Sequence, residues 1–203
     1  MPERNGGFRN PPRIRVAAGP ADTHRNPLTI KEESCVTEQR TIATCSCGQV
    51  SIALEGGHIY CAACHCDDCQ SAAHRIDALP SPEPTMDAFG GTHYVLHRKD
   101  RYTIPSGSGL LRPHRLRNGS PTRRMVASCC NSAMFLAFDN AQHWISIYRF
   151  RIQDKAPELQ ARIATRFSDH AGDLPADAPS YRTFPVALIM QLLLSRARML
   201  FGR

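Results

Sequence analysis

The chain has 203 residues, of which 42% are hydrophobic, and its formal net charge is +7. This length and apolar content suffice for one core of ordinary size, and no stretch is long enough to cross a bilayer. Residues 1–16 lack the continuous apolar segment of a secretory signal, so we expect a cytoplasmic protein with no transmembrane segment. The positive charge permits contact with nucleic acid but does not by itself indicate it.

Residues 1–40 are predicted to form a disordered or loosely attached N-terminal tail. The segment is polar, and prolines interrupt any regular period at Pro11, Pro12, Pro20 and Pro27. A segment of this kind cannot bury enough apolar surface to fold on its own. We expect it to carry no chemistry and its cysteine, Cys35, to be a small buried hydrophobic residue rather than a metal ligand.

The middle of the chain is predicted to be an antiparallel β core. A period of two is visible at Val50, Ile52 and Leu54. The glycine-containing segment 55–57 then predicts a hairpin turn into a strand at 58–60. Further strands are predicted over 94–97, 101–104, 110–117, 123–127, 134–138 and 144–150, with turns at 105–107 and 118–119. The sequence therefore predicts a mainly β domain over residues 41–151.

Residues 152–203 are predicted to form a C-terminal helical extension, because the spacing at 157–167 and 185–200 is helical rather than alternating. In the second segment one face carries Val186, Ile189, Met190, Leu193, Ala197 and Leu200. Arginines gather near its end, where cations suit the helix dipole. We expect this helix to cover the core of its own domain or of a dimer partner, with a membrane surface as the alternative.

Nine cysteines in a chain without a secretory signal point to zinc rather than to disulfides, because thiolates are the soft ligands that zinc prefers. Eight of them fall in three clusters: Cys45 and Cys47; Cys61, Cys64, Cys66 and Cys69; and Cys129 and Cys130. This amount of sulfur suffices for two ions.

The first and last clusters are predicted to share one ion. Cys45 and Cys47, followed by Gly48, fit a zinc knuckle, in which the glycine allows a tight turn. Cys129 and Cys130 could supply the other two ligands. Neighbouring side chains on an extended strand point to opposite faces, so both can bind only if the chain turns there. Cys130 is therefore preferred over Cys129 as a ligand.

The central cluster allows two arrangements. If Cys61, Cys64, Cys66 and Cys69 all bind one ion, the site is closed and structural. If only the last three bind, a fourth coordination position is open, as in a catalytic zinc site. Cys61 follows a predicted strand and is favoured as a small buried hydrophobic residue.

The motifs C45-S-C47-G48-x-V50 and C64-H-C66-x-x-C69, with a cysteine cluster after a basic strand, resemble the family of glutathione-dependent formaldehyde-activating enzymes, which also includes centromere protein V. The similarity covers about residues 43–150. It implies a β-tent zinc fold of antiparallel sheets with two zinc ions. By position, Cys45 and Cys47 would hold a structural zinc together with a later pair, and Cys64, Cys66 and Cys69 a catalytic one.

The later pair departs from the family pattern. Where the family has two cysteines separated by two residues, this chain has Ala127, Ser128, Cys129 and Cys130. Either Cys129 substitutes through a change of turn, or the structural ion lacks a fourth sulfur.

The resemblance implies a zinc-dependent carbon–sulfur lyase that acts on an adduct of a thiol, such as glutathione, with a small aldehyde. An open three-thiolate zinc suits this chemistry, because a substrate thiol is its natural fourth ligand. A basic stretch could meet the carboxylates of glutathione or a nucleic-acid backbone, or be a solvated hairpin; it comprises Arg112, His114, Arg115, Arg117, Arg123 and Arg124. The alternative function is a non-catalytic zinc-binding module with a basic macromolecule-binding surface.

Overall fold

The computed structural model describes residues 40–80, 83–153 and 156–202. The predicted tail over residues 1–40, with Cys35, lies outside these ranges except for Arg40. Within the described ranges, no helix combines the length and the apolar character needed to span a membrane.

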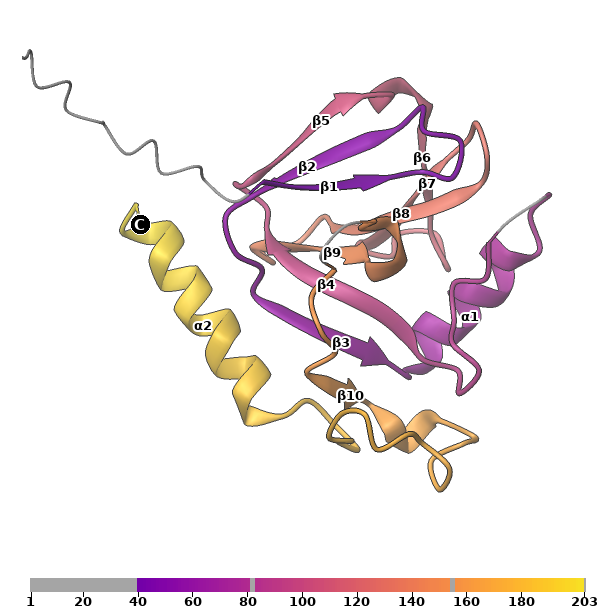
Figure 1. Ribbon diagram of the computed structural model, residues 1–203, viewed down its shortest axis with the longest axis vertical. Helices are drawn as coiled ribbons and strands as arrows, with labels where there is room; N and C mark the ends of the chain where they lie inside the picture. Colours follow the sequence, from indigo (N-terminus) through magenta and orange to yellow (C-terminus); the bar gives the residue numbers. More distant parts are fainter. Residues whose placement is uncertain (1–39, 81–82, 154–155, 203) are drawn as a thin grey trace, which may run out of the picture. The chain divides into compact units, whose positions relative to one another are not determined.

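A seven-stranded sheet forms the centre of the fold (Figure 1). Its strands, in spatial order, are β10 (Ala161–Ile163), β3 (Tyr60–Cys64), β4 (Thr92–Arg98), β9 (Trp144–Tyr148), β8 (Ser132–Phe138), β7 (Thr122–Ala127) and β6 (Leu111–His114). All neighbouring pairs are antiparallel except β10 and β3, which run parallel. The predicted mainly β fold is confirmed.

A three-stranded sheet packs on one face of the large sheet. It consists of β1 (Arg40–Thr44), β2 (Ser51–Glu55) and β5 (Tyr102–Ser106), in the order β1-β2-β5. Ile52 and Leu54 on β2 are buried in one hydrophobic cluster with Val95 and Ile147 of the large sheet. The alternation that predicted the strands therefore reflects a core shared by the two sheets.

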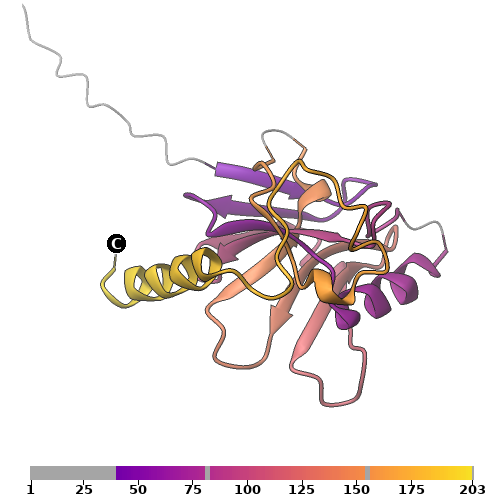
Figure 2. The same cartoon turned by 90° about the horizontal axis from the view of Figure 1, so that it is seen from below.

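Two helices lie beside the large sheet at its opposite ends: α1 (Asp67–Asp77) and α2 (Val186–Leu200) (Figures 1 and 2). A second hydrophobic cluster joins them to the sheet, and it includes Ile76 of α1, Leu188 of α2, and Tyr94 and Tyr148 of the sheet. The predicted helix at 185–200 is confirmed. Short 3-10 turns occur at Ser108–Leu110, Arg149–Arg151 and Thr165–Phe167.

The predicted hairpin between β2 and β3 is wrong. These strands belong to different sheets, and β2 pairs with β1 and β5, whereas β3 pairs with β10 and β4. Gly56, with φ of +75°, lies in the connection that carries the chain from one sheet to the other. Alternation identifies a strand but not its partner. The glycines were therefore predicted to form a hairpin turn, whereas they lie in a crossover between the two sheets.

The predicted helix over 157–167 is also wrong, because this segment contains β10 and the 3-10 turn at Thr165–Phe167. Arg162 explains why the spacing of hydrophobic residues in this segment indicated a helix. Its side chain is buried and donates to the carboxylates of Asp87 and Asp177, so a charged residue occupies a position where the pattern indicated solvent.

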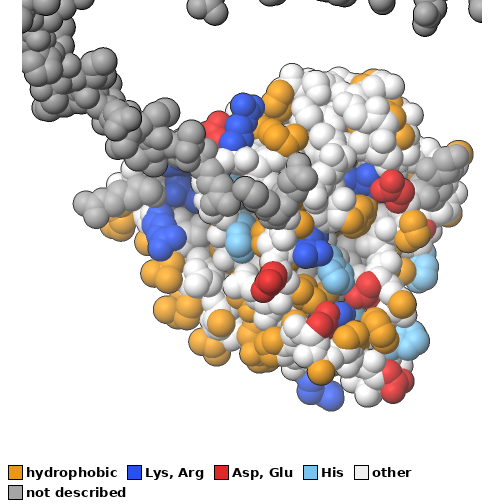
Figure 3. Space-filling view, in the orientation of Figure 1, with side chains coloured by type: hydrophobic (Ala, Val, Ile, Leu, Met, Phe, Trp, Pro, Cys, Tyr) orange, Lys and Arg blue, Asp and Glu red, His pale blue; other side chains and the backbone are white. Residues whose placement is uncertain are grey.

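Helix α2 turns a different face to the sheet from the one predicted. Leu188 and Ser195 are its buried residues, whereas Val186 and Leu193 are 74% and 58% exposed. Figure 3 shows hydrophobic side chains gathered at the left edge, over α2. Leucine, isoleucine and methionine occur nearly all round this helix, so hydrophobic spacing alone does not select the buried face.

Candidate metal centres

Four cysteines from two distant segments form the first cluster. The sulfur atoms of Cys45, Cys47, Cys129 and Cys130 all lie within 4.8 Å of one another. Cys45 Sγ is 3.6 Å from Cys47 Sγ and 3.9 Å from Cys129 Sγ, and Cys47 Sγ is 3.3 Å from Cys129 Sγ. Sulfurs around a tetrahedral zinc are about 3.8 Å apart, given Zn–S bonds of about 2.3 Å. The cluster therefore fits a zinc-sized ion with four sulfur ligands.

The first pair sits on a tight turn between β1 and β2. The backbone N–H of Val50 donates to Cys45 Sγ at 3.2 Å, and the N–H of Gly48 donates to the Cys45 carbonyl at 3.0 Å. Gly48 has φ of +77°, a conformation that a residue with a side chain rarely adopts. This is the geometry expected of a zinc knuckle.

The second pair sits on the turn between β7 and β8. Strand β7 ends at Ala127 and β8 begins at Ser132, and the chain reverses between them through Asn131, with φ of +55°. The reversal brings both Cys129 and Cys130 to the cluster. The turn that the sequence analysis required for both cysteines to bind one ion is therefore present. Cys129 makes the shorter contacts with the first pair, although Cys130 was preferred.

A buried arginine is connected to this cluster through two hydroxyls. Arg151, 3% exposed, donates to Ser46 Oγ at 2.8 Å, which is 2.8 Å from Ser132 Oγ, which in turn is 3.1 Å from Cys130 Sγ. Burial raises the pKa of Cys130, but hydrogen bonds from Ser132 and from the Cys47 backbone N–H outweigh it and lower the pKa to about 6. The hydrogen-bond donors around Cys130 thus favour a thiolate here, while the charge of Arg151 is paired with Glu83.

The second cluster contains three cysteines at the junction of β3 and α1. Cys64 is the last residue of β3, Cys66 precedes the first residue of α1, and Cys69 lies in the first turn of that helix. Their sulfur atoms lie within 4.8 Å of one another. A sharp strand-to-helix connection therefore gathers three thiols from six consecutive residues.

The three thiols differ in acidity because they hydrogen-bond to one another. Hydrogen bonds from Cys64 and Cys69 lower the pKa of Cys66 to about 3. The hydrogen bonds that Cys64 makes with Cys66 and Cys69 raise the pKa of Cys64 well above its ordinary value. The hydrogen bond with Cys64 lowers the pKa of Cys69, but its hydrogen bond to Cys66 and its burial raise it to about 12. A soft cation between the three sulfurs would stabilise all of them as thiolates.

Arg124 provides a buried positive charge beside this cluster. It is 3% exposed, its Nη2 donates to the Asp68 carbonyl at 2.8 Å, and it acts to lower the pKa of Cys66 and Cys69. Its Nε has no partner among the described residues. A buried guanidinium is costly without a nearby anion, and the thiolates supply one.

His65, between two of these cysteines, has a packing role. Its ring is completely buried, and neither ring nitrogen has a hydrogen-bond partner among the described residues. Burial lowers its pKa. A Cβ atom added at Gly91 would lie 2.9 Å from this ring. The neutral imidazole therefore wedges the β3–α1 connection against the segment that contains Gly91.

Cys61 lies away from both clusters. It is completely buried in the core between the sheets, and its thiol donates to the Pro157 carbonyl at 3.7 Å. Burial raises its pKa to about 11. This geometry is that of a small buried hydrophobic residue.

The three-cysteine cluster borders an apolar cavity of about 410 Å³. Cys64 and Cys69 line it, together with Tyr94, Trp144 and residues of α2 such as Leu188 and Leu192. The cavity thus extends from the thiols across the face of the large sheet to the C-terminal helix. Small-molecule sites typically have volumes of about 300–1,000 Å³.

The predicted basic stretch is largely paired. Arg115 and Arg123 both contact Asp139, and Arg117 contacts Asp68. Arg124 is buried beside the three-cysteine cluster and donates to the Asp68 carbonyl. The stretch therefore does not form a row of unpaired cations.

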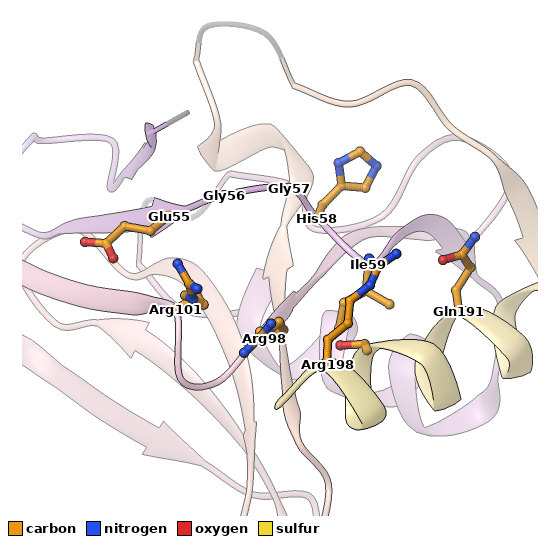
Figure 4. A pocket seen from close by; sticks show the side chains of 10 residues that line it. Glu55, Gly56, Gly57, His58, Ile59, Arg98, Arg101, Gln191 and Arg198 are labelled. Atoms are coloured by element: carbon orange, nitrogen blue, oxygen red, sulfur yellow. The ribbon is translucent and has the colours of Figure 1, made fainter. Parts of the chain in front are cut away.

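A second hollow, of about 620 Å³, has a more basic lining. Arg98, Arg101 and Arg198 approach it from the β4–β5 region and from α2, beside His58 (Figure 4). Arg98 is ion-paired with Asp100 at 2.6 Å. Neither cysteine cluster lines this hollow.

Sequence reasoning identified the cysteines and named Arg124 only as part of the basic stretch, and it missed Arg151 and the contribution of α2 to the cavity. Arginines are common in this chain, and only the register of β7 and the 3-10 turn at Arg149–Arg151 bury these two. A basic residue within an alternating strand, at an inward position, was the one available signal for Arg124.

Comparison with known proteins identifies a family without an assigned function. A sequence model described as a family of unknown function (DUF6151) matches residues 39–202. No curated protein matches the chain. A crystal structure of a Rhodobacter sphaeroides protein, a structural genomics target, aligns with a TM-score of 0.40 and 15% identity, over 56% of this chain and 88% of its own length. The resemblance to formaldehyde-activating enzymes rests on the cysteine motifs.

Proposed function

The chain belongs to the DUF6151 family of unknown function, and we propose that it is a two-zinc protein in which one zinc is structural and the other binds a thiol substrate. The four-cysteine cluster has the ligand number of a closed structural site. The three-cysteine cluster has one ligand fewer, and this difference, beside a cavity, carries the proposal.

The reaction we propose is the reversible addition of a thiol to a small aldehyde. The sulfur forms a bond to the carbonyl carbon, the electron pair of the C=O bond moves to oxygen, and the S–H proton ends on that oxygen. A zinc ion at this site would supply a Lewis acid that favours the thiolate form of the substrate. The reverse reaction is carbon–sulfur lyase chemistry, as the cysteine motifs suggest.

The residues of the chain have separable roles in this proposal. Cys64, Cys66 and Cys69 hold the ion, and Arg124 offsets the negative charge that three thiolates leave on it. The buried ring of His65 packs against the segment that contains Gly91 and so supports the connection between the first two ligands. The cavity admits the substrate and limits water around the reacting sulfur.

Metal counting by native mass spectrometry tests the site assignment. We expect two zinc ions on the full-length protein and one on a variant with Cys64, Cys66 and Cys69 replaced by serine. Retention of two ions by the variant would disprove the three-cysteine site. Cys66→Ser alone should abolish equilibration of a thiol with formaldehyde, followed by NMR, while the four-cysteine cluster keeps its ion.

The second candidate is a non-catalytic zinc module with a basic macromolecule-binding surface. The hollow with Arg98, Arg101 and Arg198 favours it (Figure 4). Salt-dependent binding of a duplex oligonucleotide, weakened by Arg198→Ala, would support it. Binding that is undetectable at low salt would remove this candidate.

A further inference from the structure

The cavity beside the three-cysteine cluster has an uncharged and largely apolar lining. Fourteen residues line it, and among these described residues there is no aspartate, glutamate, lysine, arginine or histidine. The aromatic and branched side chains include Tyr94, Phe138, Trp144, Ile163 and Leu192. Such a surface stabilises apolar groups and opposes charged ones.

One wall of the cavity is a continuous face of the large sheet. Cys64 is the register partner of Ile163 on β10, Leu96 on β4 is the partner of Ser146 on β9, and Ser146 is also the partner of Leu136 on β8. Directly paired residues present their side chains on the same face of a sheet. The thiol end of the cavity and its apolar wall are therefore parts of one surface.

Helix α2 and the segment before it form the opposite wall. Phe184, Leu188, Ile189 and Leu192 line the cavity. Adjacent Leu193 does not, and it is 58% exposed. One side of α2 thus faces the cavity with hydrophobic groups, which explains why a helix that buries few of its residues packs here.

The polar groups of the cavity are few and uncharged. Gln142 lines it, and its Oε1 is buried without a hydrogen-bond partner among the described residues. An unpartnered buried acceptor is costly unless a ligand donates to it. A hydroxyl group formed on the aldehyde carbon is a donor of the required kind.

We propose that this cavity is the substrate pocket of the three-cysteine site and that it takes a small uncharged thiol with an apolar aromatic or branched aliphatic group. This inference rests on the proposed function, and it narrows the substrate to a class that excludes glutathione. Glutathione carries two carboxylates and an ammonium group, and none of the lining side chains can pair with them. Charges that are buried without partners are strongly unfavourable.

The chain's single tryptophan, Trp144, lines the cavity and reports on its occupancy. The full-length zinc-loaded protein would be titrated with benzyl mercaptan, with benzyl alcohol and with glutathione, and Trp144 fluorescence followed. We expect benzyl mercaptan to bind at least about tenfold more tightly than glutathione, because burial of one apolar side group changes affinity by that factor or more. Benzyl alcohol should bind more weakly than benzyl mercaptan, because it lacks the sulfur.

Two neighbouring substitutions provide a matched control. Leu192→Gln places a polar group in the cavity, whereas Leu193→Gln places the same group on the exposed side of the helix. We expect the first to weaken binding of benzyl mercaptan about tenfold and the second to leave it unchanged. Equal affinities in the two variants would overturn the assignment of this pocket. The comparison of the three ligands uses the unaltered chain and so does not depend on either variant folding.

The outcomes separate this inference from the proposed function. In the cobalt-substituted protein, a bound thiolate increases the thiolate-to-cobalt charge-transfer absorption. An increase with glutathione at concentrations equal to or below those of benzyl mercaptan would overturn the apolar pocket and leave the proposed function standing. No change with any thiol, in protein that holds cobalt at both sites, would overturn both.

Discussion

Gly91 lies where a single added carbon atom should disturb one metal site and spare the other. The Cβ of an alanine would lie 2.9 Å from both Cε1 and Nε2 of the His65 ring and 3.0 Å from Asp87 Oδ2. The imidazole cannot retreat easily, because it is completely buried. The His65 backbone is fixed as well, since its N–H donates to the Ile163 carbonyl and its carbonyl accepts from Gln70 Nε2.

Gly91→Ala should therefore destabilise the protein through overpacking, at a cost of about 1–3 kcal/mol. For a domain of this size, a loss of about 2 kcal/mol corresponds to a decrease of about 4–8 °C in the melting temperature. Because His65 lies between Cys64 and Cys66, relief of the contact should also widen the three-cysteine cluster. We expect weaker zinc binding there and unchanged binding at the four-cysteine cluster.

Circular dichroism melting of the zinc-loaded protein, with zinc counted by native mass spectrometry, measures both effects. Gly172→Ala is the matched control, because a Cβ atom at Gly172 meets nothing within 4 Å. Equal melting temperatures for the two variants, within about 1 °C, would refute the packing argument. Loss of zinc from the four-cysteine cluster rather than the three-cysteine cluster would refute the link through His65.

Three further predictions concern charges and ligands. Cys130→Ser should reduce the zinc count from two to one and lower the melting temperature more than Cys66→Ser does, because a structural ion contributes folding free energy directly; equal losses would contradict separate roles. Arg124→Met should weaken zinc binding at the three-cysteine cluster about tenfold or more in chelator competition, and unchanged affinity would show that its charge is irrelevant. Burial raises the pKa of Asp87, but hydrogen bonds from His93, Arg162 and two backbone N–H groups outweigh it and lower that pKa below its ordinary value. The ionised Asp87 should therefore contribute its full stabilisation of the folded state above about pH 4, and this contribution should be lost as the pH falls below that. Asp87→Asn should then lower the free energy of unfolding by about 2 kcal/mol at pH 7 and by progressively less in acid. A loss of stability that does not depend on pH would contradict this.

Most strands could be located from the sequence, although central strands such as β3 and β8 are buried on both faces rather than on alternate sides. Strand β8 was predicted at 134–138 and is found at Ser132–Phe138, and β5 was predicted at 101–104 and is found at Tyr102–Ser106. Alternation does not show which strands pair with each other in a sheet. The pairing of β2 with β1 rather than with β3 depends on contacts between residues far apart in the chain, which no local pattern encodes.

The cysteine clusters were easier to predict than their surroundings, because ligand spacing is local. The three cysteines of the β3–α1 connection lie within six consecutive residues, so their proximity follows from the sequence alone. The meeting of Cys45 with Cys129 requires the β1–β2 and β7–β8 turns to be adjacent, and only the fold provides that. Helix α2, at the end of the chain, forms one wall of the cavity. Its hydrophobic residues are so widely distributed that the sequence did not indicate which side of the helix would line the cavity.

Arg124 and the apolar cavity are explained by one electrostatic argument. Three thiolates and a divalent zinc sum to one negative charge, which would be costly beside a cavity without charged groups. The guanidinium of Arg124 is buried at the same cluster and supplies one positive charge. Together these groups are formally neutral, so the site can lie against hydrophobic side chains without a solvated counterion. An uncharged substrate thiol that binds as a thiolate and releases its proton would upset this balance, and the proton must then reside nearby, on the aldehyde oxygen in the reaction proposed above. The same balance disfavours glutathione, whose own charges would have no counterpart among the described residues that line the cavity.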